Sequence, residues 1–140
     1  MIGSRAEPIQ RLVLDTSAYS HLRAGNSQVL DLVAGADIVL MPVIVLGELE
    51  AAFVAGSRAA ANRADLAEFL DEPFVSIVDV TRSVARRYGE IHGQLRRGGT
   101  PIPVNDIWIA AITLESSGTL LTFDTDFRQV QGLGASILVP

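Results

Sequence analysis

LVLDTS, at residues 12–17, joins three apolar residues directly to an acid and two hydroxyl residues. Its apolar half predicts a short buried strand, and Thr16 and Ser17 are residue types that favour the start of a helix. Asp15 therefore falls where a strand ends and a helix begins. In parallel α/β proteins such junctions lie at the carboxyl edge of the sheet, where ligands usually bind.

Outward from this segment, short apolar runs alternate with longer helical patterns along the chain. The runs predict strands at residues 12–14, 38–41, 74–78, 120–122 and 137–139, the last at the edge of the sheet. The longer patterns predict helices at residues 16–23, 26–35, 42–55, 57–71, 81–97 and, after a cap at Asn105, across 107–114. Alternation of this kind is typical of an α/β fold with a parallel sheet.

The composition restricts the chemistry that this chain can perform. Its 140 residues fit one domain, and a hydrophobic share of 49% with a charged share of 19% excludes a disordered chain. The sequence contains no cysteine and no lysine, which excludes disulfides, thiolate metal sites, cysteine nucleophiles and Schiff-base catalysis. Its two histidines, His21 and His92, lack the spacing of a metal pair, and we interpret them as surface or packing residues. Carboxylates, hydroxyls and a bound metal ion remain as catalytic groups.

Neither a membrane span nor a secretion signal is visible in the sequence. The longest apolar run, residues 38–46, is much shorter than the roughly 20 residues that a bilayer requires. Residues 1–11 carry charges and a proline but no apolar core, so they do not resemble a signal peptide. We therefore expect a cytoplasmic protein with no membrane contact. We interpret residues 1–11 as an N-terminal leader before a single domain at residues 12–140.

Four acidic residues are predicted at the carboxyl edge of the sheet. Asp15 and Asp124 follow two of the strands. Glu48 lies about two turns into the helix after the second strand, and Asp106 lies in the first turn of the last helix. Three of the acids have ordinary alternatives: assistance to a cap for Asp15, a helix dipole for Asp106, and a local turn for Asp124. Glu48 is surrounded by apolar residues, so its ionised carboxylate requires a partner.

Four carboxylates at one edge repel one another and raise each other's pKa unless a cation offsets their charge. Because the chain has no lysine, we expect a hard divalent cation with oxygen ligands, Mg²⁺ or Mn²⁺. Such ions also take up substrate phosphates. The residues therefore indicate a metal-dependent phosphodiesterase.

Four motifs carry a family resemblance: LVLDTS (12–17), PVIVLGELEAAFVAGSR (42–58), IPVNDIWIAA (102–111) and LLTFDTDF (120–127). In this order and spacing they resemble a PIN domain, and within that family the VapC-like ribonuclease toxins of type II toxin–antitoxin systems. The resemblance implies a three-layer α/β/α domain with a central, mostly parallel sheet of four to five strands. It also implies a Mg²⁺-dependent endoribonuclease, with Mn²⁺ able to substitute, that hydrolyses RNA phosphodiester bonds with metal-activated water. The expected partners are an RNA substrate, a small cognate antitoxin and a second copy of the chain in a homodimer.

The resemblance also assigns roles to individual residues. The catalytic acids correspond to Asp15, Glu48, Asp106 and Asp124. Asp15, Asp106 and Asp124 would hold one or two metal ions. Glu48 would contribute directly or through water.

Three further residues receive supporting roles from the resemblance. Thr16 and Ser17 provide the hydroxyls after the first acid. Asp126 would act with Asp124 or in its place.

An antitoxin is expected to cover an apolar groove near residues 43–71 and to direct a basic side chain toward the acids.

The helix expected at residues 81–97 is rich in arginine, although the whole chain carries a formal net charge of −5. The candidates for contact with the RNA backbone are Arg82, Arg86, Arg96 and Arg97. Each neutralised phosphate would strengthen binding, whereas the alternative is an ordinary solvated helix face. We interpret Trp108 and Phe123 as core residues rather than as platforms for bases.

Two other functions fit an α/β domain with acids at the sheet edge. A phosphoacceptor receiver domain requires a lysine near its phosphorylation site, and this chain has none. A catalytically silent PIN-like interaction module is the main alternative. It would be expected to have lost acids of the quartet, all of which are present here.

Overall fold

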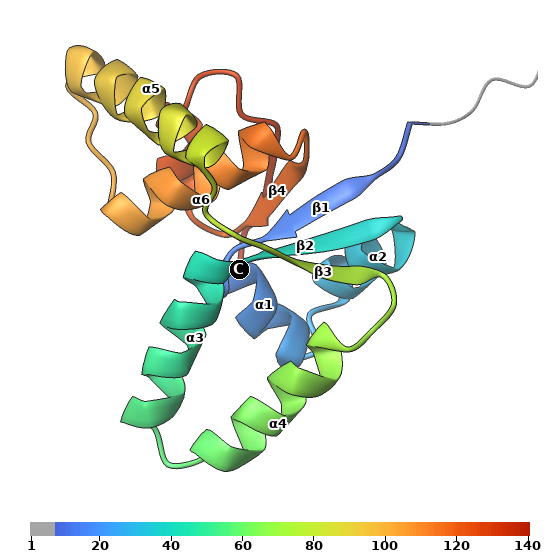
Figure 1. The fold of residues 1–140 in the computed structure, drawn as a ribbon. Helices are drawn as coiled ribbons and strands as arrows, with labels where there is room; N and C mark the ends of the chain where they lie inside the picture. Colours follow the sequence, from blue (N-terminus) through green and yellow to red (C-terminus); the bar gives the residue numbers. More distant parts are fainter. Residues whose placement is uncertain (1–7) are drawn as a thin grey trace, which may run out of the picture.

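A five-stranded sheet forms the centre of the computed structural model, which describes residues 8–140 (Figure 1). Its strands are β1 (Arg11–Leu14), β2 (Ile38–Pro42), β3 (Val75–Val78), β4 (Thr119–Thr122) and β5 (Ala135–Ile137). They lie in the order β3-β2-β1-β4-β5, and every neighbouring pair is parallel. The parallel α/β sheet expected from the sequence is therefore confirmed.

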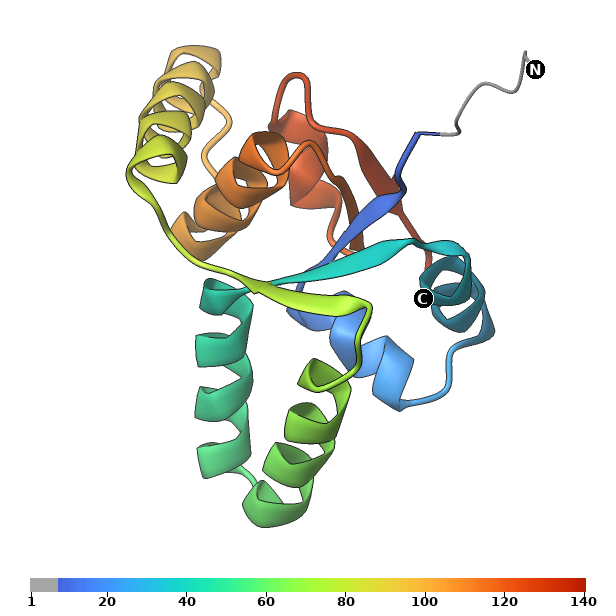
Figure 2. The same ribbon diagram turned by 45° about the vertical axis from the view of Figure 1, so that its right-hand side comes forward.

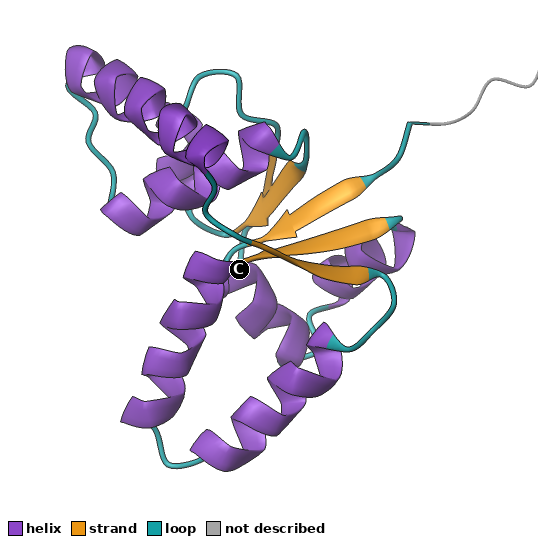
Figure 3. Cartoon of the chain, in the orientation of Figure 1, coloured by secondary structure: helices purple, strands orange, loops and turns teal. Residues whose placement is uncertain are grey.

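Helices cover both faces of the sheet, as the purple and orange elements of Figure 3 show. They are α1 (Thr16–Arg23), α2 (Ser27–Gly35), α3 (Val43–Ala55), α4 (Ala59–Leu70), α5 (Arg82–Gly98) and α6 (Val104–Glu115), with a short 3-10 helix η1 (Thr125–Gln129). Helices α1 to α4 lie on one side of the sheet and α5 and α6 on the other (Figures 1 and 2). The three-layer α/β/α arrangement is confirmed.

The strand order changes direction at β1. The chain runs outward from β1 through β2 to β3, and then returns through α5 and α6 to β4 on the other side of β1. The ends of β1 and β4 are therefore neighbours, with Leu14 paired to Leu121. The crevice outside the carboxyl ends of strands at such a switch point is the usual ligand site of a parallel α/β fold.

The apolar runs become strands because they are buried on both faces. Val13, Leu14, Leu120 and Leu121 in the central strands have no exposed surface. Full burial of each such side chain contributes about 1.5–3 kcal/mol. Helix α6 contributes a further buried run to the same core, in agreement with its apolar sequence. These buried elements hold the carboxyl edge of the sheet in place.

Several element boundaries differ from the expectation by one to three residues, and two of these differences have a clear physical reason. β5 ends at Ile137, where the expected strand begins, because the register pairs Ile137 with Thr122. Helix α6 starts at Val104, and Pro103 rather than Asn105 occupies its capping position. Both differences arise from contacts with distant or flanking backbone that the local pattern does not record.

Two further expectations concern the N-terminal leader and membrane-spanning helices. Most of the proposed leader, residues 1–7, lies outside the described residues, and Arg11 already belongs to β1. Within residues 8–140, every helix is too short or too polar to cross a bilayer.

Candidate active site

Four structural elements bring the predicted acids to the carboxyl edge of the sheet. Asp15 directly follows β1, and Asp124 follows β4 after one residue. Glu48 comes from α3 and Asp106 from α6, two helices that pack against each other. The charges of the other three acids all act on Asp106. The structure therefore brings the four predicted acids together.

Asp15 is the buried member of the group, with 5% of its surface exposed. Its Oδ1 accepts hydrogen bonds from Ser17 Oγ at 2.7 Å and Ala18 N at 2.8 Å, and its Oδ2 accepts one from Thr122 Oγ1. Burial raises the pKa of Asp15 although these three donors act to lower it. Asp15 itself caps α1, in place of the expected Thr16 and Ser17, because its side chain reaches the N–H three residues on.

Asp106 has the strongest electrostatic perturbation of the site. Burial first, and then the charges of Asp124, Glu48 and Asp15, raise its pKa to about 7. None of the three ion pairs within residues 8–140 involves any of these acids. The repulsion expected from the sequence is therefore present. No basic side chain of the described residues offsets it.

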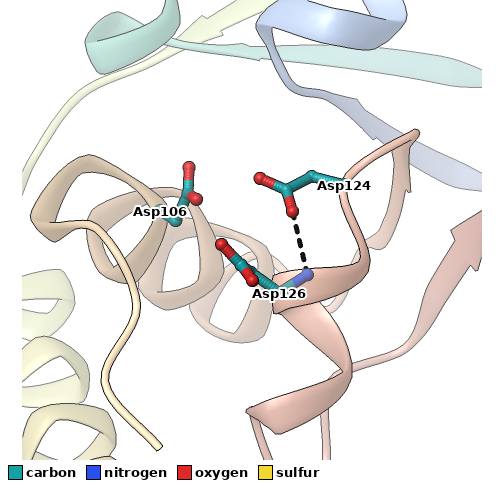
Figure 4. A group of neighbouring side chains, drawn as sticks. All are labelled: Asp106, Asp124 and Asp126. Carbon is teal, nitrogen blue, oxygen red and sulfur yellow. Dashed lines mark hydrogen bonds between the residues drawn. The ribbon is translucent and has the colours of Figure 1, made fainter.

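Asp106, Asp124 and Asp126 form a carboxylate cluster (Figure 4). One oxygen of each lies within 4.8 Å of those of the other two. Asp126 N donates to Asp124 Oδ1 at 2.8 Å and so ties the two acids of this turn together. Three carboxylates at this spacing offer the hard oxygen ligands that Mg²⁺ and Mn²⁺ prefer.

The cluster differs in one member from the metal ligands proposed from the sequence. Asp106 and Asp124 belong to it, and Asp126 takes the third place. Asp15 lies nearby, close enough for its charge to act on Asp106, but its two oxygens already accept three hydrogen bonds. The geometry therefore favours Asp126 acting together with Asp124.

Glu48 is oriented by two neighbours. Thr16 Oγ1 donates to Glu48 Oε1 at 2.6 Å, and Asn105 Nδ2 lies 3.4 Å from Oε2. The two hydroxyls expected to support the first acid therefore serve different carboxylates, since Ser17 bonds to Asp15 and Thr16 to Glu48.

Two neighbours of the acids were not identified from the sequence. Thr122 Oγ1 donates to Asp15 and accepts from Asp124 N at 3.0 Å, so one hydroxyl links the acids after β1 and β4. Asn105, interpreted as a cap, instead approaches Glu48. A hydroxyl residue at the end of a strand, two residues before an acid, was the available signal for Thr122. No local pattern indicates its partner 107 residues away.

The four arginines proposed for RNA contact are exposed on α5 but do not form one patch. Arg82 and Arg86 line a cavity of about 380 Å³ at the start of the helix. Arg96 lines a separate and mainly apolar cavity of about 300 Å³ at its end, next to Arg97 in the sequence. The first and last of these arginines are about 22 Å apart along the helix axis. None of them forms an ion pair within the described part of the chain.

The fold and the site together define a class of protein, a parallel α/β/α domain with a carboxylate centre of the kind that binds divalent metal ions. The model of the PIN domain family matches residues 12–133. This chain therefore belongs to the PIN domain family, and the resemblance given by its motifs is confirmed.

Similar proteins are known among ribonucleases and toxin–antitoxin structures. The chain is 28% identical to ribonuclease VapC5 of Mycobacterium tuberculosis over 120 residues, which cover 86% of this chain and 87% of that protein. A crystal structure of VapBC-5 from the same organism, a member of the VapBC family of toxin–antitoxin systems, matches with 26% identity and a TM-score of 0.71, covering 95% of this chain and 100% of that chain.

A second solved structure shares the fold at lower identity. VapBC2 from Rickettsia felis, bound to a DNA fragment from its promoter, matches with a TM-score of 0.82 and 23% identity. The match covers 92% of this chain and 99% of that chain. It shows that the same arrangement of helices and strands extends over nearly the whole of both chains.

Proposed function

We propose that this protein is a Mg²⁺-dependent endoribonuclease and the toxin of a type II toxin–antitoxin pair. The observation that carries the proposal is the cluster of Asp106, Asp124 and Asp126 at the switch point of a PIN fold, with Asp15 and Glu48 beside it. Similarity to ribonuclease VapC5 supports RNA as the substrate.

The donor set of the site fits a hard divalent cation, Mg²⁺ or in its place Mn²⁺. Asp106, Asp124 and Asp126 would hold it, with Asp15 and Glu48 contributing directly or through water. The chemistry that such an ion supplies when bound is a lower pKa for water and positive charge beside the phosphate. Burial and like charge raise the pKa of Asp106 to about 7, and a cation bound beside its carboxylate would favour the ionised form.

The side chains of the protein divide the remaining tasks. Asp15, held by three hydrogen-bond donors, would provide a fixed negative charge near Asp106. Glu48 Oε1 is engaged by Thr16, whereas Oε2 has only the 3.4 Å contact with Asn105. Oε2 is therefore the oxygen of Glu48 best able to accept a proton from an attacking water.

The RNA backbone is expected to contact α5. Arg82 and Arg86 have no ion-pair partner within residues 8–140 and share one cavity, so they form the principal contact. Arg96 and Arg97 would make a second contact further along the helix. Each arginine that neutralises a phosphate makes binding more dependent on salt.

A small cognate antitoxin is the expected protein partner. A cavity of about 460 Å³ lies between α1, α3 and α4, with Leu49 and Phe53 in its lining. It extends to Thr16, the hydrogen-bond donor of Glu48. An apolar segment of the antitoxin in this cavity would place a neighbouring basic side chain within reach of the acids. Antitoxin and metal ion would then compete.

A cytoplasmic homodimer completes the proposal. Large apolar side chains remain exposed on the described surface, among them Val104 at 56% and Ile77 at 49%. A second copy of the chain would remove part of this apolar surface from water. RNA, the proposed substrate, is found in the cytoplasm.

Cleavage of structured RNA by the purified protein tests the activity. We expect cleavage with Mg²⁺ or Mn²⁺ and none after exhaustive chelation. Undiminished cleavage after chelation would reject the metal mechanism. Failure to cleave with either ion would favour the catalytically silent PIN-like module.

The antitoxin part has its own measurement. Calorimetry of the toxin with its antitoxin, at zero and at saturating Mg²⁺, should show weaker antitoxin binding with the ion present. Identical affinities would reject the competition, although not the use of the cavity.

A further inference from the structure

The turn that carries Asp124 and Asp126 lies between two phenylalanines that are held in different ways. Phe127, which follows Asp126 in the chain, is 1% exposed and belongs to the core. Phe123, which precedes Asp124, is only partly buried. Its ring stacks on the ring of His21 from α1, with centroids 3.7 Å apart and an angle of 17° between the ring planes.

His21 is itself held in a fixed orientation. Its Nδ1 lies 2.9 Å from the carbonyl oxygen of Ser17, one helical turn earlier. Because a carbonyl oxygen can only accept, Nδ1 carries a hydrogen and donates it. The same Ser17 donates through Oγ to Asp15 Oδ1 and accepts from Phe123 N at 3.1 Å. One turn of α1 therefore holds Asp15 and, through both the backbone and the ring of Phe123, the start of the turn.

This turn requires such support because of its charge. Asp124 and Asp126 have carboxylate oxygens within 4.8 Å of each other and of Asp106, and no basic side chain within residues 8–140 pairs with them. Repulsion among the three carboxylates acts to move the turn away from α6. The contact with Phe127 resists this movement on one side only.

We propose that His21 is a positioning residue, which by stacking on Phe123 holds Asp124 and Asp126 in the arrangement that receives a divalent cation. The stack connects α1 to the turn at the point where the turn leaves β4, and it does so without placing a side chain in the carboxylate cluster. The stack is a packing contact, as expected for His21 from the sequence, and the proposal adds a positioning role to it. The inference rests on the proposed function in so far as that function requires a metal ion.

The experiment compares three variants of the full chain. His21→Ala removes the stack and the hydrogen bond, whereas His21→Phe keeps an aromatic ring and loses only the hydrogen bond. His92→Ala is the matched control, because His92 is the other histidine and also faces an aromatic ring, that of Tyr88 at 6.0 Å on the same helix. The probe is Mn²⁺ alone, with free ion measured by electron paramagnetic resonance. Hydrogen exchange at the amides of Phe123 and Asp126 is measured on the metal-free proteins.

We expect Mn²⁺ to bind His21→Ala about two- to tenfold more weakly than the parent, a range that matches the energy of one aromatic pair. In the metal-free protein the Phe123 and Asp126 amides of this variant should exchange several-fold faster. His21→Phe should restore both properties, and His92→Ala should leave both unchanged. Thermal unfolding of each variant confirms that it is folded.

Two results would overturn the positioning role. One is unchanged Mn²⁺ affinity and amide exchange in His21→Ala. The other is a loss in His21→Phe as large as that in His21→Ala, since the ring stack would then not be the cause. If the parent binds no Mn²⁺, the proposed metal site fails, and amide exchange alone still decides: faster exchange in His21→Ala supports the role, and unchanged exchange rejects it.

Discussion

Asp15 and Asp106 are carboxylates at the same edge of one sheet, yet the protein surrounds them differently. Asp15 accepts hydrogen bonds from Ser17, Ala18 and Thr122. Within the described residues, no hydroxyl or backbone N–H donates to Asp106, whose pKa rises to about 7 through burial and like charge. The protein itself therefore surrounds Asp15 with hydrogen-bond donors, whereas it leaves the charge of Asp106 without an offsetting partner. This difference is what the proposed cation site would exploit on the α6 side.

The largest expected effect comes from neutralising the unsatisfied side. Asp106→Asn nearly preserves shape, so its loss of activity should reflect lost metal binding. We expect RNA cleavage to fall by about 100-fold or more, because even outer-shell partners of metal ions are typically worth 10- to 100-fold. The metal-free variant should be more stable than the parent, and Mg²⁺ should stabilise it less. Thermal unfolding with and without Mg²⁺, alongside a cleavage assay, measures all three. Equal Mg²⁺-induced shifts with unimpaired cleavage would assign Asp106 a purely structural role.

Removing the satisfied acid should have the opposite effect on stability. Asp15→Ala deletes the cap of α1 and leaves the buried Thr122 hydroxyl without its acceptor. We expect the metal-free protein to lose about 2–4 kcal/mol, since an unsatisfied buried group and a lost cap each cost about 1–2 kcal/mol. Asn26→Ala, which deletes only the cap of α2, is the control and should cost about 1 kcal/mol. Denaturant unfolding checks the difference, and equal losses in the two variants would contradict it.

The difference in stability between the metal-free parent and Asp106→Asn should also depend on pH. The pKa of Asp106 is about 7 in the folded protein, above the value of about 3.9 for an unfolded aspartate. The folded state therefore binds the proton of Asp106 more tightly than the unfolded state does. The stability that this proton contributes to the folded state is complete below pH 4, decreases between pH 4 and pH 7, and is lost above pH 7. Relative to Asp106→Asn, the metal-free parent should lose roughly 2 kcal/mol across this window, after allowance for solvent screening. Stability curves of both proteins in chelator test this, and parallel curves would exclude the raised pKa.

A smaller effect is expected at the hydroxyl that connects the two sides. Thr122→Val removes the donor to Asp15 and the acceptor for Asp124 N. Thr113→Val is the control, because Thr113 is also buried and its hydroxyl donates to a helix carbonyl at 2.8 Å. Both should lose about 1 kcal/mol of stability. Only Thr122→Val should reduce the stabilisation by Mg²⁺, and an equal Mg²⁺ response in the two would separate Thr122 from the site.

The smallest expected effect lies outside the acids. Arg82→Gln and Arg86→Gln should raise KM for RNA a few-fold and leave kcat unchanged. Each should also reduce the slope of log affinity against log salt by about 0.7, as expected for one phosphate of single-stranded RNA. Arg63→Gln is the control, because Arg63 is paired with Glu50 at 2.8 Å. RNA binding measured at several salt concentrations tests this prediction. If Arg82→Gln and Arg86→Gln have the same slope as Arg63→Gln, the arginines of α5 form an ordinary solvated helix face.

Much of the site could be predicted because its acids follow recognisable elements. Asp15 and Asp124 come after apolar strands, and Asp106 opens an apolar helix, so local patterns place them at one edge. The partners of these acids could not be predicted. The resemblance gave Asp126 a role with Asp124 or in its place, but its position beside Asp106 depends on how η1 approaches α6, which no local pattern records. His21 lies on a short helix whose local sequence gives no indication of a ring 102 positions away.

By itself, the amino-acid sequence determined the parallel α/β class, the positions of the strands to within about two residues, and the four acids expected at the carboxyl edge of the sheet. These depend on apolar periodicity and on residue preferences at strand and helix ends, which act over a few neighbouring residues. Only the tertiary structure decided which acid receives hydrogen bonds from the protein and which acid is left facing like charges. Thr122 reaches Asp15 because β1 and β4 pair in one register, and Asp106 meets Asp124 because α6 packs at the same edge. Hydrogen bonding and charge repulsion depend on distances between such segments, and those distances exist only once the sheet and helices have assembled.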